Sequence, residues 1–128
     1  MPISEDFVKN TMASWLKSEG YRQVEARLGT RKGYDVEGVN SETGKLLVIE
    51  CKGEAQKGSQ LHRSWSNVAS AILTSINEVS APTVTVEVGM AFPDTKEYRG
   101  RMERLKQFCK SNFISVFWVA ENGSIEKW

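Results

Sequence analysis

Residues 33–54 read GYDVEGVNSETGKLLVIECKGE, and this stretch decides the fold. Two runs rich in apolar and β-branched residues flank the polar segment NSETGK, a pattern typical of two antiparallel strands joined by a turn. Asp35 and Glu50 lie 15 positions apart, inside the two runs rather than in the turn. A charged side chain within an apolar strand is unfavourable unless it is paired or binds a cation. The hairpin therefore predicts a site as well as two strands.

The hairpin also predicts which side chains meet. With the turn centred in the middle of NSETGK, Asp35 lies opposite Glu50, or one position away if the loop is longer, with Cβ atoms about 4.5–5.5 Å apart. Lys52 shares the face of Glu50, whereas the Cys51 side chain points to the other face and its backbone carbonyl can turn toward the acids. Two such carboxylates repel each other unless a cation lies between them, and oxygen ligands with room for water suit Mg²⁺.

An ordinary cross-strand ion pair on the surface is the alternative interpretation of these charges. It explains exposed strands well. Glu50, however, follows the apolar run LLVI and is expected near the core. A buried acid beside a second acid favours a functional site over a surface pair.

The remaining segments predict an α/β fold. In order, we expect a helix from Ser4 to Gly20, strands at 21–29, 34–39 and 45–51, a helix at 59–79, a strand at 83–92, a helix that opens at Pro93 and Asp94, a strand at 113–120, and a tail or edge strand at 121–128. Alternation of strand and helix in the later part favours parallel pairing with crossovers. The prediction is a mixed sheet, an antiparallel hairpin extended by parallel strands, with helices on its faces.

The length and composition limit the classes of protein to which this chain can belong. The chain has 128 residues, 40% of them hydrophobic, which fits one domain with a hydrophobic core. Its net charge of +1 does not by itself indicate a nucleic-acid-binding protein. No run approaches the ~20 apolar residues of a membrane span, and the start, MPISEDFVKN, lacks the layout of a signal peptide. The two cysteines form no disulfide framework or zinc spacing. We therefore expect a single domain at 1–128, in a cytoplasmic setting and without a membrane partner.

The arrangement resembles the PD-(D/E)XK nuclease superfamily, which includes type II restriction enzymes, Mrr-type restriction endonucleases and archaeal Holliday junction resolvases. The resemblance rests on the order helix–strand–strand–strand–helix–strand, with Asp35 on the second strand and Glu50-Cys51-Lys52 on the third. It covers a core of about residues 1–92 and leaves 93–128 as an elaboration. Tyr34 stands where the motif name has proline. The resemblance implies a restriction endonuclease-like three-layer α/β/α fold with a mixed central sheet.

The resemblance also implies an activity and separate roles for the residues of the motif. The activity is Mg²⁺-dependent endonucleolytic hydrolysis of DNA phosphodiester bonds, in defence or repair, with Mn²⁺ able to substitute. Asp35 and Glu50 would be metal ligands, and the Cys51 carbonyl a further ligand. Lys52 would be the catalytic lysine, which orients the attacking water or stabilises the transition state.

Many superfamily members carry a glutamate on the first helix that reaches the metal or its water. Glu5 is the best match for it, and Asp6 and Glu19 are weaker choices. Glu5 also suits a second interpretation, in which it only stabilises the positive end of the helix dipole.

Basic and polar residues near the hairpin would hold DNA, mainly through phosphate contacts. They are Arg27, Arg31, Lys32, Lys57, Gln60 and Arg63. A second basic stretch, residues 96–110, also contains acids, and its charges form either a solvated helix face or a basic patch. Cutting both strands would require two active sites, which a homodimer supplies.

Two other functions stay open. The first is a non-catalytic nucleic-acid-binding or assembly domain on the same fold, which the near-neutral charge favours and the intact Asp35, Glu50 and Lys52 disfavour. The second is a metal-dependent phosphoesterase that acts on small nucleotides, which would have a deep pocket rather than an open groove.

Overall fold

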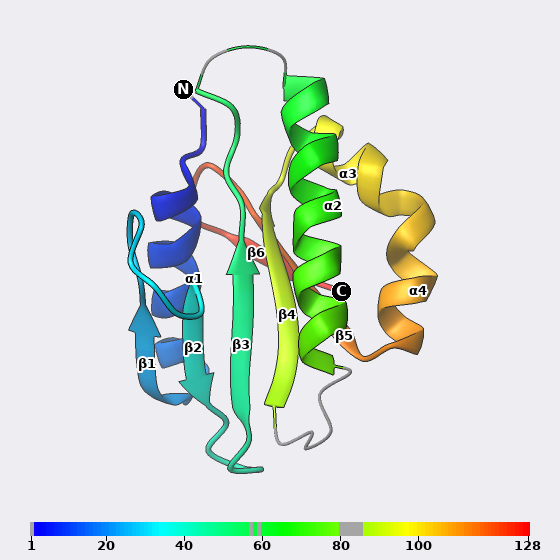
Figure 1. The fold of residues 1–128 in the computed structure, drawn as a ribbon. Coiled ribbons are helices and arrows are strands. Elements are labelled where there is room, and N and C mark those ends of the chain that lie inside the picture. The colour runs from blue at the N-terminus through cyan, green and yellow to red at the C-terminus, as the bar shows by residue number, and fades with distance from the viewer. Residues whose placement is uncertain (1, 57, 59, 80–85) are drawn as a thin grey trace.

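The computed structural model describes residues 2–56, 58, 60–79 and 86–128. These form α1 (Glu5–Ser18), β1 (Arg22–Ala26), β2 (Val36–Val39), β3 (Leu46–Cys51), α2 (Gln60–Val79), β4 (Val86–Pro93), α3 (Lys96–Met102), the 3-10 helix η1 (Glu103–Leu105), α4 (Lys106–Ser111), β5 (Ile114–Val119) and β6 (Ile125–Lys127). Figure 1 shows this succession along the chain. It confirms the predicted order of helices and strands, including the edge strand expected as one possibility for the C-terminal tail, β6. The one difference is that the last predicted helix is divided into α3, η1 and α4.

The described strands form one six-stranded sheet in which the strands follow their order in the sequence. β1–β2 and β2–β3 are antiparallel, β3–β4 and β4–β5 are parallel, and β5–β6 is antiparallel. The predicted mixed sheet is therefore confirmed. In the β2–β3 hairpin Val36 lies opposite Ile49, which is the register predicted from the turn.

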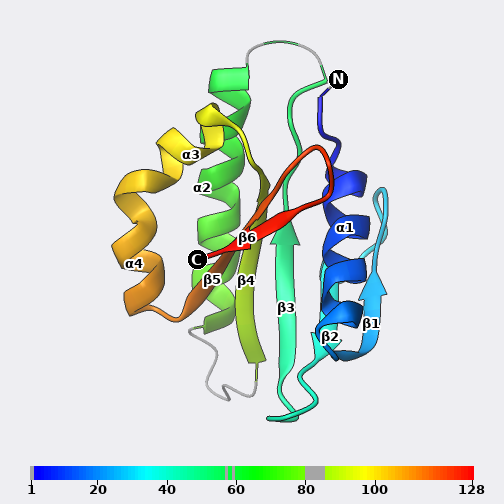
Figure 2. The same cartoon turned by 180° about the vertical axis from the view of Figure 1, so that it is seen from behind.

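Helices cover both faces of the sheet. Figures 1 and 2 show α1 on one face and α2, α3 and α4 on the other. The α1 side of the core includes Met12, Ile49 and Phe117, and the opposite side includes Val68, Met90 and Trp118. The segment that sequence analysis treated as an elaboration, 93–128, thus supplies β5 and two of these buried aromatic side chains.

The ends of α1 and α3 follow from their sequences. Ser4 caps α1, because its Oγ accepts a hydrogen bond from the Phe7 N–H at 3.0 Å, and Thr95 caps α3 in the same way. Val8, Met12 and Leu16 then bury one face of α1 against the sheet. Within the described part of the chain, no helix is both long and apolar enough to span a membrane.

Candidate active site

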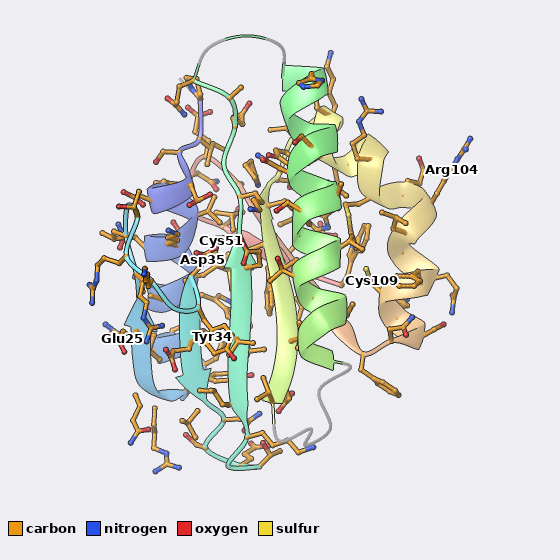
Figure 3. The ribbon with its side chains drawn as sticks, viewed as in Figure 1. Glu25, Tyr34, Asp35, Cys51, Arg104 and Cys109 are labelled. Atoms are coloured by element: carbon orange, nitrogen blue, oxygen red, sulfur yellow. The ribbon has the colours of Figure 1, made fainter. Side chains whose placement is uncertain are left out.

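The three charged residues of the hairpin meet at the carboxyl end of β3. Asp35 comes directly before β2, Glu50 lies within β3, and Lys52 directly follows that strand. The register continues from Val36 opposite Ile49 and so places Asp35 beside Glu50. Figure 3 shows Asp35 next to Cys51 at the end of β3, where α1 approaches the sheet. In open α/β sheets this edge, beyond the carboxyl ends of the strands, is where ligands bind.

Backbone and side-chain donors fix the Asp35 carboxylate. Its Oδ2 accepts a hydrogen bond from the Cys51 N–H at 2.8 Å, and its Oδ1 lies 3.6 Å from Lys9 Nζ. Each carboxylate oxygen has a second lone pair, so these contacts orient Asp35 and leave it able to bind another cation. The Cys51 carbonyl faces the same side as the Cys51 N–H, because both groups of a strand residue point toward the same neighbouring strand.

Lys52 pairs with Glu50. The Lys52 Nζ lies 3.1 Å from Glu50 Oε1 and 3.5 Å from Ser70 Oγ of α2. Burial raises the pKa of Glu50, and the charge and hydrogen bond of Asp35 raise it further, whereas Lys52 lowers it. The net direction is upward, so Lys52 only partly offsets the unfavourable position of this acid. The carboxylate pair therefore favours binding a further positive charge.

We expect Glu50→Gln to raise the free energy of unfolding at neutral pH without divalent cations. Because the folded-state pKa of Glu50 lies above its ordinary value, ionisation of Glu50 at neutral pH opposes folding, and the amide removes that charge. The gain should disappear as the pH falls below the ordinary range of a glutamate, since Glu50 is then protonated in both the folded and the unfolded chain. Urea denaturation across this pH range measures the difference, with exposed Glu42→Gln as the control. A gain that grows at low pH would contradict the prediction.

Lys9 of α1 is a component of the site that the sequence analysis missed. It is only 1% exposed, and its Nζ lies 3.1 Å from Glu5 Oε2, 2.7 Å from the Arg27 carbonyl oxygen and 3.6 Å from Asp35 Oδ1. Burial alone lowers the pKa of Lys9, but the hydrogen bond with Glu5 and the charge of Asp35 outweigh it and raise the pKa above its ordinary value. The sequence does indicate that Lys9 is buried, because it lies three positions before Met12 and so shares the buried face of α1.

Glu5 is held at the edge of the site by Lys9. Its side chain is 43% exposed and forms the ion pair with Lys9 Nζ, so that Lys9 lies between Glu5 and Asp35. Asp6 instead accepts a hydrogen bond from the Gly29 N–H at 3.1 Å. Glu19 is the C-cap of α1, about 20 Å along the helix from Glu5, and is not at the site. Of the three acids, Glu5 is therefore the one whose carboxylate the structure connects to Asp35.

The segment after Lys52 is clamped in place. The Gly53 carbonyl accepts hydrogen bonds from the Tyr98 hydroxyl at 2.6 Å and from Asn67 Nδ2 at 3.2 Å. The Glu54 N–H donates to the Ile3 carbonyl at 2.7 Å, which ties the same segment to the start of α1. A hollow of about 350 Å³ opens beside this clamp. It is lined by Ser4, Glu5, Asp6, Gly53, Glu54, Gln56 and Asn67.

The residues predicted to hold DNA have different positions. Arg27 is engaged within the protein, since its guanidinium pairs with Glu37 and donates to the Tyr34 carbonyl at 2.9 Å. Arg31, whose side chain is 65% exposed, and Lys32 lie in the exposed loop before Asp35. Lys57 lies outside the described residues, and so do the side chains of Gln60 and Arg63. Of the predicted DNA-holding side chains that the structure describes, Arg31 and Lys32 are thus the exposed ones, and they lie in the loop that leads into Asp35.

The second basic stretch lies away from the site. Arg99 of α3 pairs with Asp94 at 2.7 Å and with Glu126 at 3.1 Å. Arg104 points outward from the edge formed by α3 and α4, on the far side of α2 from Asp35 (Figure 3). This placement agrees with a solvated helix face.

The oxygen donors that could hold a metal ion at this site are few. Among the described residues, no group of three or more His, Cys, Asp or Glu side chains is placed to hold a metal ion. Two carboxylates and the Cys51 carbonyl would leave the other positions to water and substrate phosphate, which is how Mg²⁺ is often bound. The Cys51 thiol is not a donor, because it is fully buried and its burial raises its pKa well above the ordinary value.

Comparison of the chain with protein-family models, with curated proteins and with solved structures found no match. The function is therefore inferred from the fold and from the site.

Proposed function

We propose that this chain is a Mg²⁺-dependent endonuclease that hydrolyses DNA phosphodiester bonds, with the restriction endonuclease-like fold of the PD-(D/E)XK superfamily. The observation that carries the proposal is the meeting of Asp35, Glu50 and Lys52 at the carboxyl end of β3. All three side chains are mostly buried, at 19%, 23% and 15% exposure. A surface ion pair is normally well solvated. Burial of charged groups instead strengthens their electrostatic interactions, which a catalytic site requires.

Each residue of the trio has a task that its contacts support. The fixed Asp35 carboxylate and the Glu50 carboxylate would hold the metal ion, with the Cys51 carbonyl beside them. A bound Mg²⁺ would lower the pKa of a water molecule and offset charge on the phosphate. Lys52, with its ammonium group 3.1 Å from Glu50, would orient the attacking water or stabilise the negative charge that develops on the phosphate oxygens.

The exposed loop before Asp35 would guide DNA to these residues. Arg31 and Lys32 are exposed and would contact phosphate groups, which position a duplex without reading its sequence, and Arg31 would exchange its exposed ion pair with Glu25 at 3.8 Å for such a contact. Arg27 would act indirectly, because its pairing with Glu37 and with the Tyr34 carbonyl holds the same loop. A homodimer would place a second site on the opposite strand.

Cleavage assays test the proposal. Supercoiled plasmid and labelled oligonucleotide duplexes should be cut by the wild-type chain with Mg²⁺ or Mn²⁺ and left intact with a chelator. Asp35→Ala should remove the activity, whereas Glu42→Ala, an exposed acid in the turn of the same hairpin, should retain it. Cleavage that survives both the chelator and Asp35→Ala would sink the mechanism.

Two further measurements distinguish the proposed endonuclease from the two alternative functions. Hydrolysis of a small nucleotide phosphodiester without cleavage of DNA would identify the phosphoesterase. A wild-type chain that neither cuts DNA nor binds divalent cations in a calorimetric titration would favour the non-catalytic assembly domain.

A further inference from the structure

The buried ammonium group of Lys9 lies beside Asp35, one of the two carboxylates proposed to bind the metal ion. Lys9 reaches Asp35 from α1, while Lys52 reaches Glu50 from the end of β3. The two lysine side chains therefore approach the carboxylate pair from opposite sides. The mechanism proposed above uses Lys52 and gives no task to Lys9.

The contacts of Lys9 are unequal. Its ammonium group has two oxygen atoms within hydrogen-bond distance, the Arg27 carbonyl at 2.7 Å and Glu5 Oε2 at 3.1 Å, and lies 3.6 Å from Asp35 Oδ1 in an ion pair. The first two anchor the ammonium group. The contact with Asp35 is the longest of the three. Lengthening it further would therefore weaken the interactions of Lys9 least.

The charges of the site set how strongly it attracts a cation. Glu5, Asp35 and Glu50 supply three negative charges, and the two lysines supply two positive ones, which leaves one net negative charge. Without Lys9 the net charge would be two negative. A divalent ion at Asp35 would lie within several ångströms of the Lys9 ammonium, and like charges at that range repel strongly in a poorly solvated site.

We propose that Lys9 is a resident counter-cation of the site, which holds Asp35 in place before metal binds and which an incoming divalent cation must oppose. The inference rests on the proposed metal site at Asp35 and Glu50 and concerns the regulation of its affinity. Lys9 is a positioning residue in this view: it keeps the two acids folded together at low metal concentration and weakens metal binding in return.

Calorimetric titration of the full chain with Ca²⁺ or Mg²⁺, without DNA, tests the inference. Lys9→Met removes the charge and keeps a long apolar side chain, and it should bind either cation about tenfold more tightly than wild type. Lys17→Met, an exposed lysine near the other end of the same helix, should leave the affinity unchanged. Tighter binding by Lys9→Met alone, including binding where wild type shows none, supports the inference.

The other outcomes separate this inference from the proposed function. If wild type binds the cation and Lys9→Met binds it equally or more weakly, Lys9 is not a counter-cation, and the metal site stands. If neither chain binds, the metal site and the inference both fail. If Lys9→Met does not fold in a chelator, circular dichroism during the titration decides: refolding by Ca²⁺ supports the exchange of one cation for the other, and its absence overturns it.

Discussion

Lys52→Met should slow DNA cleavage by about 10²–10³-fold, the loss expected when one donor to a developing negative charge is removed. The Lys52 ammonium lies 3.1 Å from Glu50 Oε1, and the Lys52 side chain is 15% exposed. Methionine keeps the length of the side chain and loses only the charge and its hydrogen bonds. Single-turnover cleavage with Mg²⁺ and excess enzyme measures the chemical step without the contribution of substrate binding.

The matched control for Lys52→Met is Lys45→Met, which removes a lysine from the exposed end of the turn in the same hairpin. It should cleave at the wild-type rate. DNA binding in Ca²⁺ should change little in either variant, because one charge among several phosphate contacts is a small part of the affinity. A Lys52→Met chain that is folded and cleaves within about threefold of wild type would show that the ammonium group stabilises the site and not the reaction.

The hairpin shows why much of the fold and the site could be predicted. The turn between its two apolar runs sets the register, and with a side-chain period of two the register alone decides which residues meet. Val36 opposite Ile49 was therefore predictable, and with it the proximity of Asp35 and Glu50. These are relations within one continuous segment, where the sequence spacing and the distance in space are linked.

Relations between distant segments could not be predicted in this way. Lys9 meets Asp35 only because α1 packs across the end of β3, and nothing in the spacing of the two residues sets that approach. The same holds for Arg27, which reads as a DNA contact in the sequence and is paired with Glu37 in the structure.

The single predicted helix after Pro93 shows a local limit. Its apolar positions follow helical spacing throughout, yet the structure inserts the 3-10 turn η1 between α3 and α4. Met102 and Cys109 both remain buried on either side of this turn. The apolar pattern was right for these two residues but wrong for Phe108, which is 39% exposed, because a tighter turn shifts which side chains after it face the core.

Gly53→Ala should lower the free energy of unfolding by about 3 kcal/mol, at the upper end of what overpacking usually costs. A Cβ atom on Gly53 would overlap the Glu5 backbone nitrogen and lie 2.8 Å from the Ser4 carbonyl carbon. Both are backbone atoms at the start of α1, so no side-chain rotation relieves the contact. The start of α1 would have to move away from the segment after Lys52, and urea denaturation measures the loss.

The same displacement should weaken the site, because Glu5 and Lys9 move with the first turns of α1 while Asp35 stays with the hairpin. Gly100→Ala is the matched control: its Cβ would meet no atom within 4 Å in α3, and it should raise stability by about 0.5–1 kcal/mol through helix propensity. Gly53 has no left-handed backbone angle that alanine would strain, so the predicted loss is steric alone. A Gly53→Ala chain as stable as wild type would mean that α1 is not held against the end of β3, and the link between Lys9 and Asp35 would lose its structural basis.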